Sequence, residues 1–243
     1  MMIPLLEILY QDKFLVVINK PAGIAVHRSK LCRSEKLYIL QLLRQQINRF
    51  VYPVHRLDKP TSGILVFGLN REVANTMMHQ FAARNIQKTY TAVVRGFTQG
   101  EESINYPLAR TDRKVSQLDP ERQSAETDYT RVKTVETPEA IGRYQTARYS
   151  LLTVTPKTGR YHQIRKHMAH IAHPIIGDTK YGDRFHNRFF KQQLGLQHLM
   201  LSATDISFNH PVTNTKLTIT TQPNPDFEKL FQLWHWDNDI FTG

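Results

Sequence analysis

The amino-acid sequence predicts an α+β fold with a large mixed, mostly antiparallel β-sheet and flanking helices. Runs typical of strands outnumber runs typical of helices, and the helices do not alternate regularly with the strands, as a doubly wound parallel sheet would require. Neither an internal repeat nor a linker-like segment interrupts the chain. We therefore expect a single domain over residues 1–243.

The predicted strands are runs of β-branched and aromatic residues bounded by Gly, Pro or Asn. They cover residues 6–12, 14–21, 63–70, 88–96, 126–137, 148–157, 199–211 and 216–223. After the second run, the residues from Lys20 to Gly23, with Pro second and Gly fourth, are typical of a turn.

Apolar residues at helical spacing predict three helices, each with one buried face. The shared faces are Leu40, Leu43, Ile47 and Phe50 in the first helix, Ala74, Met77, Met78, Phe81 and Ala82 in the second, and Ile164, Met168, Ile171 and Ala172 in the third. Ser34 and Asn70 are candidate N-caps of the first two. Residues 109–124 are polar and aperiodic, which predicts a mobile loop.

Composition narrows the class of protein. The chain carries 32 Lys and Arg against 21 Asp and Glu, a formal net charge of +11. No apolar run approaches the roughly 18 residues of a membrane span, and the amino terminus lacks a secretory signal, so we expect a cytoplasmic protein. Cys32 is the only cysteine, which excludes an internal disulfide and a multi-cysteine zinc site.

The positive charge is concentrated in residues 157–191, which hold eight Lys and Arg against two acids. Residues 224–243, by contrast, are net acidic. A concentrated basic stretch favours a nucleic-acid partner, and a solvated charged face is the alternative.

Asp58 is the first candidate for chemistry. It is the only carboxylate between Lys36 and Arg71, and Arg56 and Lys59 flank it. The Pro, Thr, Ser and Gly that follow predict a tight turn into the next strand. A lone carboxylate among cations stays ionised and could act as a nucleophile or base; the alternative is a surface aspartate paired with arginine.

Two further segments carry candidate site residues. Strand alternation places Tyr90 on one face with Ala92 and Val94, where it is either a core residue or a ring that stacks on a nucleobase. At helical spacing Arg165 lies beside the apolar stripe of the third helix, where it could pair with a buried carboxylate and contact phosphate or base on its other side. A helix start after Gly159 would also point free amides at a phosphate.

A metal site is not expected, although His167, His170 and His173 are spaced three apart. Arg165 and Lys166 share their helix and would repel a cation, and the sequence holds no metal-site signature. We expect these histidines to contact RNA or solvent. Nucleotide-binding glycine motifs are also missing from the sequence, so no cofactor is expected.

Taken together, these segments resemble the RluA-type pseudouridine synthases. The matching motifs are HRLDKPTSG at 55–63, KTYTAVVRG at 88–96, GRYHQIRKHMA at 159–169, HPIIGDTKYGD at 173–183 and LMLSA at 199–203, in the order of that family. The resemblance spans about residues 6–222 and implies a mixed antiparallel sheet split by a central RNA-binding cleft. It further implies isomerisation of uridine to pseudouridine after base flipping, without a cofactor.

The resemblance also implies a substrate and an assembly. It favours the members of the family that act on tRNA at uridine 65 and that lack an S4-like RNA-binding domain at the amino terminus. Ribosomal RNA as the substrate and a non-catalytic RNA-binding module are the alternatives. A monomer is the family-like expectation.

Roles carry over to this sequence residue by residue. Asp58 corresponds to the essential catalytic aspartate, Tyr90 to the tyrosine that stacks on the target uracil, and Arg165 to the basic residue that pairs with the aspartate. Arg56 corresponds to the arginine that helps displace the target base, and Ile164 to an apolar wall. The remaining expected RNA contacts are His55, Lys157, Arg160, His162, Lys180, Arg184 and Arg188.

Overall fold

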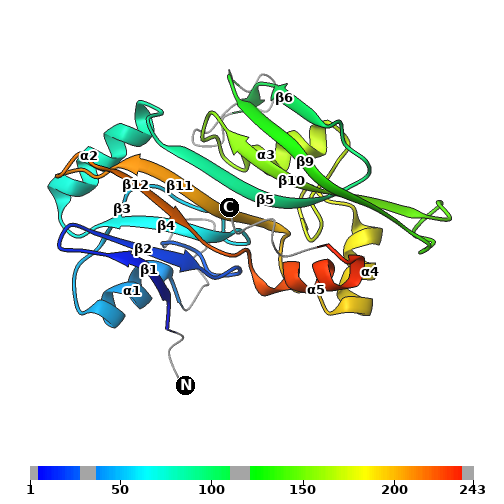
Figure 1. Cartoon of the computed structure of the whole chain (residues 1–243), viewed down its shortest axis with the longest axis horizontal. Coiled ribbons are helices and arrows are strands. Elements are labelled where there is room, and N and C mark those ends of the chain that lie inside the picture. The colour runs from blue at the N-terminus through cyan, green and yellow to red at the C-terminus, as the bar shows by residue number, and fades with distance from the viewer. Residues whose placement is uncertain (1–4, 28–36, 110–120, 237–243) are drawn as a thin grey trace. The chain divides into compact units, whose positions relative to one another are not determined.

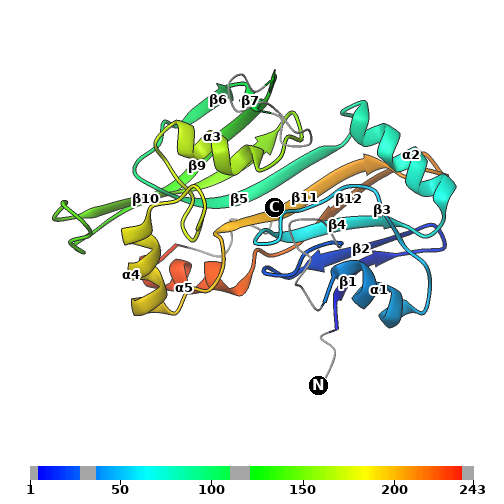
Figure 2. The ribbon, with the colours of Figure 1, turned by 180° about the vertical axis from the view of Figure 1, so that it is seen from behind.

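The computed structural model describes residues 5–27, 37–109 and 121–236. The chain divides into two compact units, one comprising Met1–Lys88 with Ser202–Phe227 and the other comprising Thr89–Leu201 with Glu228–Gly243. Figures 1 and 2 show the elements of both units from opposite sides. The expectation of one domain stays a prediction. Within the described residues, the structure contains no helix that is long and apolar enough to cross a membrane.

The first unit is built on a sheet with the strand order β1-β2-β4-β11. Its strands are β1 (Glu7–Gln11), β2 (Leu15–Lys20), β3 (Tyr52–Pro53), β4 (Ser62–Gly68), β11 (Leu201–Asn209) and β12 (Lys216–Thr220). Strand β3 pairs with β4 and β12 pairs with β11. Strands β4 and β11 are parallel, whereas the other pairs are antiparallel. The predicted strands of this unit are confirmed, and β3 is an addition.

Helix α2 (Arg71–Ala82) covers one face of this sheet through Val73, Ala74 and Met77. Its predicted cap is confirmed, because the Asn70 side chain accepts a hydrogen bond from the amide of Val73. The prediction for Met78 is wrong, since this side chain is 42% exposed.

Helix α1 (Ile39–Ile47) differs from its prediction at both ends. It begins after Tyr38, and the candidate cap Ser34 lies outside the described residues. Asn48 adopts a left-handed conformation that ends the helix, so Phe50 lies beyond it and is 72% exposed. The prediction that Phe50 shares the buried face is therefore wrong.

The second unit has the strand order β5-β10-β9-β6, and these pairs are antiparallel. Its elements are β5 (Gln87–Arg95), β6 (Glu101–Asn105), β7 (Leu108–Ala109), β8 (Arg122–Gln123), β9 (Glu126–Thr137), β10 (Ala147–Pro156), α3 (Gln163–His170) and α4 (Arg184–Leu194). Strands β7 and β8 pair with each other, so the two ends of the predicted loop 109–124 form a short ladder. The centre of that loop lies outside the described residues.

The helices α4 and α5 (Pro225–Trp234) were not predicted from the sequence. In the second unit they contribute Phe190 and Trp234 to an aromatic cluster around Tyr149 of β10. The rings of Tyr149 and Trp234 are stacked with centroids 4.9 Å apart. This packing holds α4 against the sheet of its unit.

Candidate active site

Asp58 lies on a tight turn that leads into β4, as predicted. The amide of Thr61 donates to the carbonyl of Asp58 at 3.1 Å, and β4 begins at Ser62. Gly63 has a φ of +105°, and a Cβ at this position would lie 2.1 Å from the carbonyl oxygen of Ala203 on the parallel strand β11. Only glycine fits this close approach. The turn is thus positioned by direct backbone packing of β4 on β11.

The side chain of Lys20 supports the turn that carries Asp58, a feature that sequence reasoning missed. Its buried ammonium donates to the carbonyls of Pro21 at 2.8 Å, Lys59 at 3.2 Å and Thr61 at 2.8 Å. Three acceptors require three N–H bonds, which only the protonated amine has. Burial lowers the pKa of Lys20 to about 7, and the charge of Asp58 opposes that shift. Lys20 therefore both holds the turn and places a positive charge near Asp58.

His55 fixes the chain just before Asp58. Its Nε2 accepts a hydrogen bond from the amide of Val66 at 3.0 Å, and its ring stacks on Phe81 with centroids 4.6 Å apart. Burial, reinforced by the charge of Lys88, lowers the pKa of His55 to about 3, so the ring is neutral. The neighbouring Arg56 is exposed. The RNA contacts expected of both residues stay predictions.

Tyr90 lies in β5 opposite Val154 of β10 and is 9% exposed. The ring is thus largely buried, which agrees with a core residue, and its stacking on a nucleobase stays a prediction. Asp58 belongs to the first unit, whereas Tyr90 and Arg165 belong to the second. The expected meeting of these three side chains stays a prediction.

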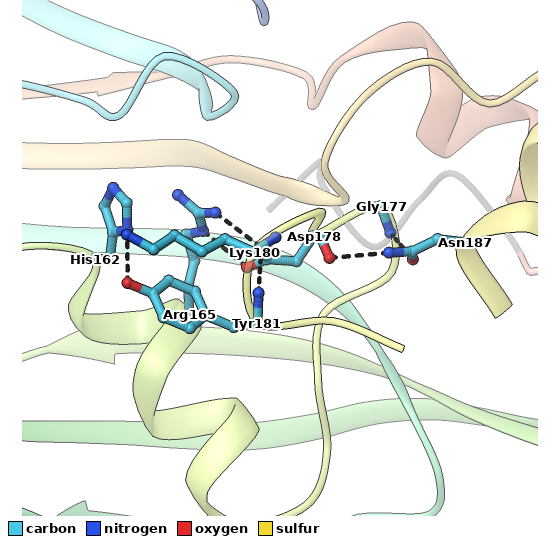
Figure 3. A network of polar contacts seen from close by, with 7 residues as sticks. All are labelled: His162, Arg165, Gly177, Asp178, Lys180, Tyr181 and Asn187. Atoms are coloured by element: carbon cyan, nitrogen blue, oxygen red, sulfur yellow. Dashed lines mark hydrogen bonds and ion pairs between the residues drawn. The ribbon is translucent and has the colours of Figure 1, made fainter. Parts of the chain in front are cut away.

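Arg165 forms a buried ion pair with Asp178 (Figure 3). Its Nε donates to Oδ2 and its Nη2 to Oδ1, both at 2.8 Å, and the two side chains are 4% and 1% exposed. The Asp178 carboxylate also accepts from the amides of Lys180 and Tyr181. Burial alone would raise the pKa of Asp178, but these hydrogen bonds lower it. The prediction that Arg165 pairs with a buried carboxylate is confirmed, and the carboxylate is Asp178.

His162 precedes α3 in a left-handed conformation with a φ of 55°. Its Nδ1 is 3.0 Å from the hydroxyl of Tyr181 (Figure 3). Burial lowers the pKa of His162 to about 3, and the charges of Arg165, Lys180 and Lys166 add to the effect. The ring is therefore neutral in spite of its basic surroundings.

A buried polar network fixes the start of α3. Gln163 accepts from Thr158 at 2.6 Å and from the amide of Arg160 at 2.9 Å, and it donates to Thr127 at 2.9 Å. Thr127 in turn lies 2.9 Å from Nδ1 of His167. The helix begins at Gln163 and not directly after Gly159. The amide of Arg160 is already bound to Gln163, so the prediction that it points freely at a phosphate is wrong.

His167 is fully buried, and its Nε2 lies 3.0 Å from the carbonyl of Tyr106. His173 lies 2.8 Å from the carbonyl of Arg95. The prediction that these histidines face RNA or solvent is therefore wrong for His167. Among the described residues, no group of three or more His, Cys, Asp or Glu side chains could hold a metal ion.

The remaining predicted RNA contacts differ in their surroundings. Lys157 forms an exposed ion pair with Asp128 at 2.9 Å. The Nε of Arg160 donates to the carbonyl of Ser124 at 3.1 Å. Lys180, Arg184 and Arg188 are exposed, whereas Ile164 is 7% exposed. The RNA contacts expected of these cations stay predictions, and Ile164 belongs to the apolar interior of its unit.

Known proteins similar to this chain belong to the family that the sequence motifs indicate. A family model described as RNA pseudouridylate synthase matches residues 14–170. The chain is 50% identical to tRNA pseudouridine synthase C of Haemophilus influenzae over 96% of this chain and 100% of that protein. It is 48% identical to the protein of the same name from Pasteurella multocida, over 96% and 97% of the two chains.

Solved structures share the fold. Human RNA Pseudouridylate Synthase Domain Containing 4 superposes with a TM-score of 0.71 at 24% identity, covering 94% of this chain and 93% of its own. Human RNA Pseudouridylate Synthase Domain Containing 1 superposes with a TM-score of 0.72 at 21% identity, covering 98% and 97%. The predicted fold class is confirmed.

Proposed function

The chain belongs to the RNA pseudouridylate synthase family, and from this premise we propose that it isomerises uridine to pseudouridine in tRNA. The observation that carries the proposal is its identity of 48–50% to proteins named tRNA pseudouridine synthase C over nearly the whole chain. The target we propose is uridine 65, which rests on the sequence resemblance. A cytoplasmic location and a monomeric state stay predictions.

We assign the central chemical role to the carboxylate of Asp58. In the reaction the N1–C1′ bond breaks, the uracil turns, and C5 bonds to C1′, so no atom is gained or lost apart from protons. An ionised Asp58 can attack the sugar or the base, or remove a proton at C2′. The ammonium of Lys20 near the turn favours the ionised form of Asp58.

Other side chains would hold the uracil and the RNA. In this proposal Tyr90 stacks on the detached base, Arg165 stabilises the Asp58 carboxylate, and Arg56 fills the place of the flipped base. Extruding a base costs a few kcal/mol, and cationic contacts to phosphate offset that cost. The residues assigned to RNA binding are His55, Lys157, Arg160, His162, Ile164, Lys180, Arg184 and Arg188.

Release of tritium from C5-labelled uridine in tRNA tests the catalytic proposal. Asp58→Asn should abolish release and leave tRNA affinity nearly unchanged, because it removes one charge with little change in shape. Asp205→Asn, which changes a half-buried carboxylate of β11, is the matched control and should keep its activity. Substantial turnover by Asp58→Asn would contradict the role of Asp58.

Mapping of pseudouridine tests the proposed target. Total RNA from cells with and without the gene should differ at uridine 65 of tRNA. A difference confined to ribosomal RNA would contradict the tRNA assignment while leaving the reaction intact. No difference in any RNA, together with tRNA binding that Asp58→Asn does not alter, would favour a non-catalytic RNA-binding module.

A further inference from the structure

Tyr161, which precedes the N-cap His162 of α3, lies at the centre of a cluster in which only His162 and Lys180 have a role in the proposed function. Its half-buried ring stacks on His162 with centroids 3.7 Å apart and an interplanar angle of 22°. The ammonium groups of Lys166 and Lys180 lie 5.4 Å and 5.8 Å from the centroid of the Tyr161 ring. Lys180 also lies 5.4 Å from the centroid of the Tyr181 ring. Two lysines from different segments thus converge on one aromatic ring.

The electrostatics of this cluster favour an anion. The carboxylate oxygens of Asp178 accept from Arg165 and from the amides of Lys180 and Tyr181. His162 adds no charge at neutral pH because its pKa is lowered to about 3. Two ammonium groups near one ring make this surface positive, and a positive surface attracts the phosphates of a nucleic-acid backbone.

We propose that Tyr161, Lys166 and Lys180 form a subsite that binds a nucleotide other than the target uridine. A nucleobase stacks on the Tyr161 ring, and the two lysines contact the adjoining phosphates. Aromatic stacking with flanking cations is the general way in which proteins hold unpaired nucleotides without selecting the base. The inference rests on the proposed function for its ligand, an RNA strand. It adds a binding role for Tyr161 and Lys166.

Affinity for an unmodified tRNA transcript, measured by filter binding in the full-length Asp58→Asn background, tests the stacking. Tyr161→Ala and Tyr161→Leu should weaken binding roughly 5- to 100-fold, because both remove the aromatic face. Tyr161→Phe should bind like the parent. The matched control is Tyr144→Ala, since Tyr144 is 52% exposed and also carries an arginine over its ring, at 5.0 Å. This control should bind like the parent.

Three outcomes would overturn the subsite. Tyr161→Leu with parental affinity would show that Tyr161 only packs against His162. Tyr161→Phe as weak as Tyr161→Ala would show that the hydroxyl, and not the ring face, is recognised. Tyr144→Ala as weak as Tyr161→Ala would show that the loss is not specific to this cluster. Thermal melting of each variant identifies an unfolded protein, and the Leu variant replaces the Ala variant if the latter does not fold.

Lys166 and Lys180 allow a second measurement, the salt dependence of tRNA affinity, which a purely structural role would leave unchanged. Lys166→Met and Lys180→Met should each lower the slope of log affinity against log salt by about 0.7–0.9. An unchanged slope in both would overturn the phosphate contacts. These binding results are independent of turnover. If Asp58→Asn keeps its activity while the Tyr161 series behaves as expected, only the catalytic assignment fails.

Discussion

The turn that carries Asp58 and the helix that carries Arg165 are held in place by different kinds of contact. The turn depends on its backbone: Lys20 binds three carbonyls, His55 accepts from a strand amide, and Gly63 packs directly on a neighbouring strand. The helix depends on side chains, since Arg165 pairs with Asp178 and Gln163 binds Thr127 and Thr158. The turn should therefore be sensitive to backbone shape, and the helix to the loss of a single polar partner.

Gly63→Ala should give the largest effect and tests the backbone side of this comparison. The added Cβ would lie 2.1 Å from the carbonyl oxygen of Ala203, and the φ of +105° is unfavourable for alanine. We expect a loss of about 4 kcal/mol or more in the free energy of unfolding, measured by urea denaturation. Gly23→Ala is the matched control, because Gly23 has a φ of +84° but nothing within 4 Å of a Cβ. It should cost only about 1–2 kcal/mol, and equal losses would show that φ alone governs both sites.

Asp178→Asn tests the side-chain half of the comparison. It removes one charge of a buried ion pair, which should cost about 3–5 kcal/mol of unfolding free energy. The double variant Arg165→Met with Asp178→Asn removes both charges and keeps an acceptor oxygen for the amides of Lys180 and Tyr181. We expect it to recover much of the loss. A double variant as unstable as Asp178→Asn would show that the ion pair itself, and not its unpaired member, determines the stability.

The same difference explains what the sequence could predict. The Asp58 turn was predictable because its turn residues are contiguous in the chain and each has a local conformational preference. The partners Lys20 and Asp178 were not identified, since Lys20 is 41 residues from Thr61 and Asp178 is 13 residues from Arg165. Only the tertiary fold brings such residues together.

The strongly periodic strands and the second helix were predicted well for the same local reasons. Helix α4 was missed because its apolar stripe is short: His186 and Phe190 are its buried residues. Its ends carry usable signals, namely the N-cap Asp183 and the left-handed Gly195. Helix α5 carries a clear stripe at Phe227, Leu230, Phe231 and Trp234, so periodicity alone could have found it.

Lys20→Met tests whether the turn needs a buried cation or only a filled space. Methionine retains most of the volume, but the carbonyls of Pro21 and Thr61 lose the ammonium donor, and that of Lys59 keeps only the amide of Gly23. We expect a loss of about 2–3 kcal/mol of unfolding free energy. Lys59→Met, at an exposed position on the same turn, should change it by less than about 0.5 kcal/mol. A Lys20→Met protein as stable as the parent would mean that packing, and not hydrogen bonding, supports the turn.

His55 and His162, which are both neutral in the folded protein, allow the two regions to be compared by how their stability depends on pH. The pKa values of His55 and His162 are about 3 in the folded protein and about 6.5 in an unfolded chain. Below pH 6.5 the unfolded chain binds protons that the folded protein does not, so stability falls as the pH decreases from 6.5 towards 3. His55 should contribute a slope of about 1 kcal/mol per pH unit, and the half-buried His162 a smaller slope because solvent screens its charged neighbours. Urea denaturation at pH 7 and pH 5 measures the total loss, to which the lowered pKa values of His167 and His186 also contribute.

His55→Gln and His162→Gln should each reduce this pH-dependent loss, whereas His79→Gln, at an exposed position of α2, should leave it unchanged. Burial is the main cause of the lowered pKa at both rings, but the charges that add to it differ. Lys88 acts on His55, whereas Arg165, Lys180 and Lys166 act on His162. Lys180→Met should therefore raise the pKa of His162 and leave that of His55 unchanged, which NMR titration of the two rings can resolve. Equal shifts at both rings would mean that the variant acts through the fold as a whole, because a charge removed beside His162 acts mainly on that ring.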